Sequence, residues 1–125
     1  MERYESWLER AKSSYEISRT TTKNDIIYYE DLCYQLQQSV EKALKGLLIF
    51  YGVDPEFTHN IGLLLNELEK YTNIPENIKL TTNVTKYAII TRYPGEYDEI
   101  TKDDYEESIK IAKNCLDWVE NKIFK

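Results

Sequence analysis

The chain has 125 residues, with 16 lysine or arginine side chains against 22 aspartate or glutamate side chains, which gives a formal net charge of -6 at pH 7. This balance argues against a protein whose whole surface attracts phosphates, although it is compatible with a local basic patch. The length is sufficient for one domain with its own core, so we expect a single domain over residues 1–125. Because neither a leader pattern nor an apolar run of about 18 residues is visible, we expect a cytoplasmic protein that does not enter a membrane.

The first periodic segment runs from Glu2 to about Arg19 and predicts a helix. Its apolar residues recur at steps of three and four, as on one face of a helix. They are Tyr4, Trp7, Leu8, Ala11 and Tyr15. A loop rich in serine and threonine follows, in which Asn24 or Asp25 is a candidate N-cap for the next helix.

The longest periodic segment is Tyr28–Gly52, and it predicts one long helix. Its apolar residues form a stripe wide enough for the core face of a helical bundle. They are Leu32, Leu36, Val40, Ala43, Leu44, Leu47, Leu48 and Tyr51. Gly52 suits the position just after a helix because it adopts positive φ without strain. Gly46 inside the helix costs about 1 kcal/mol relative to alanine, which predicts a close helix–helix approach there, within the bundle or across a dimer.

Two further helices are predicted before the last segment. Thr58 or Asn60 can cap a helix over Ile61–Tyr71, which is shorter than the others. A fourth main helix is expected from about Ile74 to Thr91, because apolar residues recur there at helical spacing until Pro94-Gly95 ends the pattern.

The last predicted helix runs from about Lys102 to Ile123, where Thr101 and Asp104 have the spacing of a capping box. Long helices joined by short loops bury their apolar faces against one another. We therefore predict an all-α, antiparallel up-and-down bundle of four main helices plus one shorter helix.

The order of motifs resembles that of the HEPN domain family (higher eukaryotes and prokaryotes nucleotide-binding domain). The most specific string is QQSVEKALKGLL at residues 37–48; Thr58-His59 then opens a leucine-rich helix and Arg92-Tyr93-Pro94 follows the fourth helix. The resemblance covers nearly the whole chain. It implies a compact helical bundle that is usually a homodimer and commonly occurs with a small nucleotidyltransferase partner.

Several branches of this family are metal-independent ribonucleases and toxins, in which a histidine follows an arginine after four to six residues. Arg92 matches the arginine, but the segment from Arg92 to Glu99 contains no histidine, and Tyr93 replaces the usual polar neighbour. Cleavage of RNA through its 2′-hydroxyl needs an acid and a base near neutral pH, which histidine supplies most easily. In some members of the family a partner modifies a tyrosine near the arginine motif, and the resemblance makes Tyr97 the position to test.

We therefore expect a non-catalytic HEPN-type binding domain. Its partners would be a second copy of the chain, a nucleotidyltransferase-like protein, and a nucleotide or RNA ligand, in a toxin–antitoxin or stress system. A metal-independent ribonuclease with a non-standard set of Arg92, His59 and Tyr97 is one alternative. A purely structural dimerisation module is another.

Six residues are candidates for ligand binding. They are Arg92, Tyr93, His59, Lys42, Lys45 and Gln38. Arg92 either binds an anion or satisfies the last carbonyls of its own helix. His59 contacts a ligand or bonds the backbone near the third helix. Gln38, Lys42 and Lys45 share one side of the long helix, where they face either a cleft or solvent, and Glu41 and Lys45 have the spacing of an exposed helical ion pair. One histidine and two separated cysteines give no metal-site spacing, and no cofactor is expected.

Overall fold

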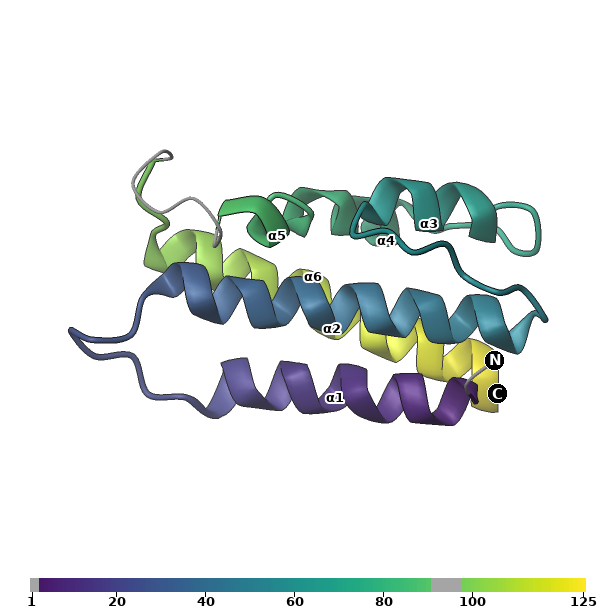
Figure 1. The fold of residues 1–125 in the computed structure, drawn as a ribbon, viewed down its shortest axis with the longest axis horizontal. Helices are drawn as coiled ribbons and strands as arrows, with labels where there is room; N and C mark the ends of the chain where they lie inside the picture. The colour runs from purple at the N-terminus through teal and green to yellow at the C-terminus, as the bar shows by residue number, and fades with distance from the viewer. Residues whose placement is uncertain (1–2, 91–97) are drawn as a thin grey trace.

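The computed structural model describes residues 3–90 and 98–125, and all its regular elements are helical. In chain order they are α1 (Tyr4–Thr20), α2 (Tyr29–Phe50), α3 (Ile61–Leu68), α4 (Glu76–Lys79), the 3-10 helix η1 (Leu80–Val84), α5 (Tyr87–Ile90) and α6 (Lys102–Phe124). The elements run up and down along one long axis (Figure 1), which confirms the predicted antiparallel all-α bundle.

Helix α2 is the centre of the bundle. It packs against α1 on one side, α6 on another, and the α3–α5 layer on a third (Figure 1). Its predicted apolar stripe lies in the core, and Leu36, Val40, Ala43, Leu44, Leu47 and Leu48 are all fully buried. Neighbouring helices therefore cover the apolar stripe of α2 on several sides. None of the helices in the described ranges has both the length and the apolar character needed to cross a bilayer.

Gly46 lies at a close approach of α2 to α1. A Cβ atom built on Gly46 would lie 3.1 Å from Trp7 Cβ and 3.4 Å from the Tyr4 carbonyl oxygen. The first partner is the stem of a side chain and the second is backbone, so neither can swing aside. The close approach predicted for this glycine is thus confirmed, and it lies within the bundle.

The predicted fourth helix, Ile74–Thr91, is wrong as one continuous element. Up to residue 90, where this described range ends, the segment consists of α4, η1 and α5, of which none exceeds five residues there. Thr81 and Thr82 donate their hydroxyl hydrogens to the carbonyls of Ile78 and Lys79, three residues earlier. Threonine hydroxyls compete in this way with regular helical bonding, and short 3-10 segments are the usual result.

The helix ends agree with the predictions in part. Asn60 caps α3 through its side chain, and Thr101 and Asp104 form a reciprocal capping box at α6. Gly52 has φ of 83°, as expected after α2. The predicted N-cap of α2 is wrong: Tyr28 occupies that position, while the Asn24 side chain accepts from the backbone of residues 26 and 27 in the preceding loop.

Candidate functional site

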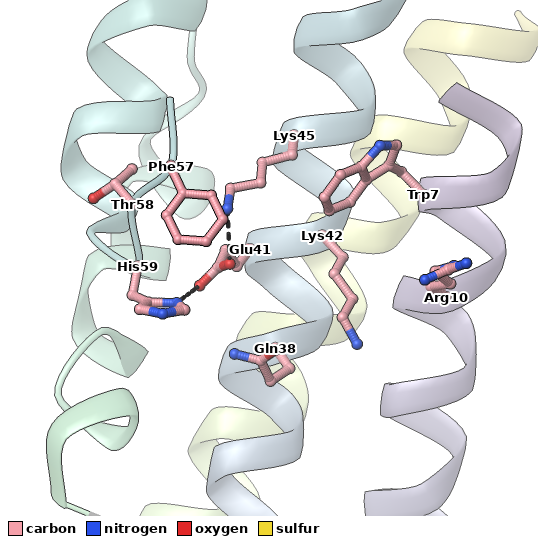
Figure 2. A pocket seen from close by; sticks show the side chains of 9 residues that line it. All are labelled: Trp7, Arg10, Gln38, Glu41, Lys42, Lys45, Phe57, Thr58 and His59. Carbon is pink, nitrogen blue, oxygen red and sulfur yellow. Dashed lines mark hydrogen bonds and ion pairs between the residues drawn. The ribbon is translucent and has the colours of Figure 1, made fainter. Parts of the chain in front are cut away.

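A cavity of about 250 Å³ opens between α1, α2 and the loop at residues 53–60 (Figure 2). The bundle fixes two of its walls, because α1 and α2 are long and packed along their length. The third wall is the segment that leads from Gly52 into α3. The lining residues are Trp7, Arg10, Gln38, Glu41, Lys42, Lys45, Phe57, Thr58 and His59.

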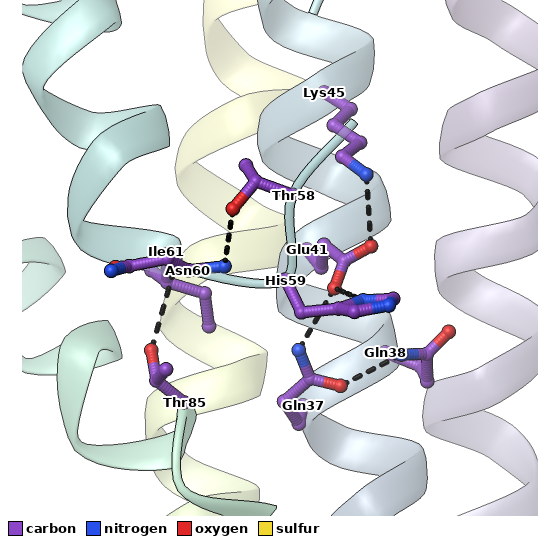
Figure 3. Close-up of polar contacts among 9 residues, drawn as sticks. All are labelled: Gln37, Gln38, Glu41, Lys45, Thr58, His59, Asn60, Ile61 and Thr85. Atoms are coloured by element: carbon purple, nitrogen blue, oxygen red, sulfur yellow. Dashed lines mark hydrogen bonds and ion pairs between the residues drawn. The ribbon is translucent and has the colours of Figure 1, made fainter. Parts of the chain in front are cut away.

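The floor of the cavity holds a buried carboxylate with three donors. The Glu41 side chain is 6% exposed. Its Oε1 atom lies 2.8 Å from His59 Nδ1 and accepts from Gln37 Nε2 at 2.9 Å, while Oε2 accepts from Lys45 Nζ at 3.0 Å (Figure 3). Gln38 Nε2 extends this network by donating to Gln37 Oε1 at 2.7 Å. The Glu41 carboxylate on α2 thus holds the loop at residues 53–60 through its bond with His59.

Opposing effects act on the Glu41 carboxyl group. Burial raises its pKa, but the hydrogen bonds from His59, Gln37 and Lys45 outweigh burial and hold the pKa below its usual range. Glu41 is therefore ionised at neutral pH. The expectation of an exposed Glu41–Lys45 pair is wrong, because the loop at residues 53–60 covers both side chains and leaves Lys45 only 9% exposed.

Two other cations on the cavity wall have no carboxylate partner in the part of the chain that the structure describes. Lys42 Nζ donates to the neutral Ser14 hydroxyl at 3.0 Å, and within the described ranges neither Lys42 nor Arg10 forms an ion pair. Burial lowers the pKa of Lys42 from its ordinary value, and the positive charge of Arg10 adds to this effect while Glu41 opposes it. Two like charges are thus held near each other at the cavity wall.

Two aromatic rings line the same cavity. Trp7 is half-buried on α1, with Lys45 Nζ 5.9 Å from its ring centre, and Phe57 is fully exposed at the edge of the cavity. A second cavity of about 250 Å³ lies beyond these two rings, where Asp54 and Glu56 contribute carboxylates. Its acidic lining makes it a poor place for an anion, so the first cavity is the candidate anion site.

The HEPN domain model matches residues 4–122 of this chain. The chain belongs to the HEPN domain family. A solved archaeal HEPN homologue, ST0689, is 35% identical, with a TM-score of 0.76 and coverage of 98% of this chain and 99% of that one. TT1696 from Thermus thermophilus is 30% identical, with a TM-score of 0.83 and the same coverage. A curated relative from Methanocaldococcus jannaschii, "Putative toxin MJ1304", is 28% identical over 92% of this chain and 84% of its own length.

The fold of this HEPN domain brings four of the predicted site residues into one cavity. Gln38, Lys42, Lys45 and His59 all line it, although His59 bonds a carboxylate and not the backbone that was considered as an alternative. The remaining predicted site residues fall outside the described ranges. They are Arg92, Tyr93 and Tyr97.

Sequence reasoning missed the residues that complete the cavity of the HEPN domain. Trp7 and Arg10 were assigned only to a helix, and Phe57 only to a loop. The sequence does contain a sign of Arg10's role. Arg10 lies in a helix that must pack beside the long helix, and neither residue four positions away is acidic, so the helix itself offers it no ion-pair partner at that spacing. Among the described residues, no group of three or more His, Cys, Asp or Glu side chains is arranged to hold a metal ion.

Proposed function

We propose that this HEPN domain is a non-catalytic binding module that takes a nucleotide, free or within RNA, into the cavity between α1, α2 and residues 53–60. The observation that carries this proposal is that Arg10 and Lys42 line one cavity without an ion-pair partner among residues 3–90 and 98–125, in a chain with net charge -6. Acidic side chains outnumber basic ones, yet among the described residues none forms an ion pair with either cation. A phosphate would supply the missing negative charge, and the Arg10 guanidinium is suited to bidentate phosphate contacts.

The aromatic rings that line the same cavity support a nucleotide over a simple anion. Phe57 exposes its whole ring at the cavity edge, and Trp7 forms part of the wall. Stacking of a base on an aromatic ring contributes about 1–3 kcal/mol and tolerates any base. The volume of about 250 Å³ is small for a ligand site, which favours a single nucleotide.

Binding to a labelled single-stranded RNA hexamer that contains all four bases tests the proposal. Fluorescence anisotropy should show an affinity that falls with salt, and Arg10→Ala and Lys42→Ala should each weaken binding about tenfold, equivalent to ~1.4 kcal/mol. Loss of one phosphate contact should also reduce the slope of log affinity against log salt by about 0.7. Nucleoside monophosphates should compete with the hexamer.

Two matched variants control for a general change in charge. Arg19→Ala removes an arginine from α1 that pairs with Glu16, and Lys113→Ala removes a lysine from α6 that pairs with Asp117. Both should leave the affinity within twofold of the parent chain. No binding, or equal losses in all four variants, would contradict the cavity as the site. Absence of any nucleotide or RNA effect on the melting temperature would favour the purely structural dimerisation module.

The same proposal includes a homodimer that acts with a nucleotidyltransferase-like protein in a toxin–antitoxin or stress system. Its support is membership of the HEPN family and the relative named as a toxin. Light scattering coupled to size exclusion tests the dimer, and a monomer at micromolar concentration would contradict it. A nucleotidyltransferase gene next to this one, whose product co-purifies with the chain, would support the partner.

The relative named as a toxin favours a second candidate, a metal-independent ribonuclease. His59, held by Glu41 through Nδ1, has the orientation of a general base, and Arg92 and Tyr97 would complete the set. Incubation of the purified protein with structured RNA in the presence of a metal chelator decides between the two. Cleavage that disappears in both Arg92→Ala and His59→Ala would establish the enzyme, and no cleavage would leave the binding module.

A further inference from the structure

The ionised Glu41 carboxylate fixes the orientation of the polar side chains around it. An ionised carboxylate accepts hydrogen bonds and cannot donate. Every group bonded to Glu41 must therefore present a hydrogen to it. Two chains of hydrogen bonds begin at its Oε1 atom, one through His59 and one through Gln37 and Gln38.

The first chain determines the tautomer of His59. Nδ1 lies 2.8 Å from Glu41 Oε1, so Nδ1 carries the hydrogen of this bond. A neutral imidazole has only one N–H, which leaves Nε2 as an acceptor. The side chain is 50% exposed and lines the cavity, and within the described part of the chain Nε2 has no hydrogen-bond partner. His59 thus offers an acceptor to a ligand.

The second chain determines the orientation of Gln38. Gln37 Nε2 donates to Glu41, so the Gln37 amide leaves its Oε1 as an acceptor, and Oε1 accepts from Gln38 Nε2 at 2.7 Å. The Gln38 amide oxygen is directed away from Gln37 (Figure 3), and Gln38 lines the same cavity as His59. Both chains of hydrogen bonds thus end in acceptors, while Arg10 and Lys42 offer donors with positive charge.

A ligand that matches this arrangement carries hydroxyl donors close to an anion. Ribose next to a phosphate has this chemistry, and the 2′-hydroxyl is the group that distinguishes RNA from DNA. We propose that the cavity selects ribonucleotides over 2′-deoxyribonucleotides, because ribose hydroxyls donate to His59 Nε2 and Gln38 Oε1 while Arg10 and Lys42 hold the phosphate. This inference rests on the nucleotide binding proposed above and adds the sugar to it.

The test compares the RNA hexamer with a DNA hexamer of the same bases, in which deoxyuridine replaces uridine. Fluorescence anisotropy measures the affinity for each hexamer. The parent chain should bind RNA about five- to tenfold more tightly than DNA, the difference that one unmade hydrogen bond in a desolvated site produces. His59→Phe and Gln38→Met keep the approximate shape of each side chain and remove the acceptor, together with the hydrogen bond that each donates to Glu41 or Gln37. The ratio of RNA to DNA affinity should fall towards one in the variant that removes the acceptor of the 2′-hydroxyl, because a hydroxyl donates one hydrogen and DNA never makes this bond.

Glu56→Gln serves as the control, because it alters the same loop at an exposed side chain of the neighbouring cavity and should keep the ratio. Thermal melts verify that each variant is folded, and if His59→Phe unfolds, Gln38→Met alone carries the comparison. Failure to bind either hexamer would overturn both proposals. Equal binding of RNA and DNA by the parent chain, or a ratio that survives in both acceptor variants, would overturn only the selection of ribose.

Discussion

Replacement of Glu41 by glutamine removes the negative charge from the buried network and measures how much the fold depends on it. Glu41 bonds His59, Gln37 and Lys45 at 2.8, 2.9 and 3.0 Å. The variant leaves the Lys45 ammonium, 9% exposed, without its counterion. Removing one partner of a buried pair costs about 3–5 kcal/mol. With an unfolding entropy of about 2.1 cal/mol/K per residue over 125 residues, the same loss lowers the melting temperature by about 11–19 °C.

Guanidinium denaturation followed by far-UV circular dichroism gives the free energy of unfolding directly. Glu67→Gln is the matched control, because Glu67 pairs with Lys70 at 3.2 Å on an open surface and its loss should cost less than about 1 kcal/mol. The paired change Glu41→Leu with Lys45→Met should recover much of the loss, since it removes both buried charges. A cost below about 1 kcal/mol for Glu41→Gln would refute the view that this charge supports the fold.

The remaining predictions concern Gly46 and acid. Gly46→Ala should lower the free energy of unfolding by about 1 kcal/mol in guanidinium melts, because the cost of overpacking exceeds the gain in helix propensity. The oligomeric state should not change, because the added methyl group meets Trp7 and Tyr4 of the same chain. A more stable variant would contradict this prediction. Since the folded pKa of Glu41 is depressed, its contribution to stability is complete above the unfolded pKa of about 4.3 and is lost as pH falls through the folded pKa. Melts from pH 6 to pH 2 should therefore fall less steeply in Glu41→Gln than in the parent chain, and parallel curves would contradict the assignment.

Predictions from sequence succeeded where one residue or one stripe determines the local structure. The stripe of α2, the Asn60 cap and the positive φ of Gly52 each depend on chemistry within a few residues. The segment 74–91 failed because its apolar spacing is helical while its threonine hydroxyls bond back to carbonyls three residues earlier. Periodicity reports which face is buried and is insensitive to such competition.

Sequence patterns predict some residues of the candidate site and miss others, again because a pattern does not report tertiary contacts. Helical periodicity predicts Gln38, Lys42 and Lys45, because they share the side of α2 opposite its buried stripe. The position of His59 just before α3 predicts the fourth residue. The burial of Glu41 could not be foreseen, because it depends on the path of residues 53–60 over α2. That path is a tertiary property, which turns an ordinary helical ion-pair spacing into a buried network.

The walls of the cavity differ in how firmly they are held. Helices α1 and α2 belong to the packed bundle, whereas the side-chain bond from His59 to Glu41 fastens the loop at residues 53–60 to α2. Rupture of a hydrogen bond to a charged group costs about 1.5–3 kcal/mol, far less than a typical global unfolding free energy of about 5–15 kcal/mol. Amide hydrogens of this loop should therefore exchange through a local opening while those of α2 stay protected. The proposed nucleotide would then enter and leave by displacement of this loop, with the bundle intact.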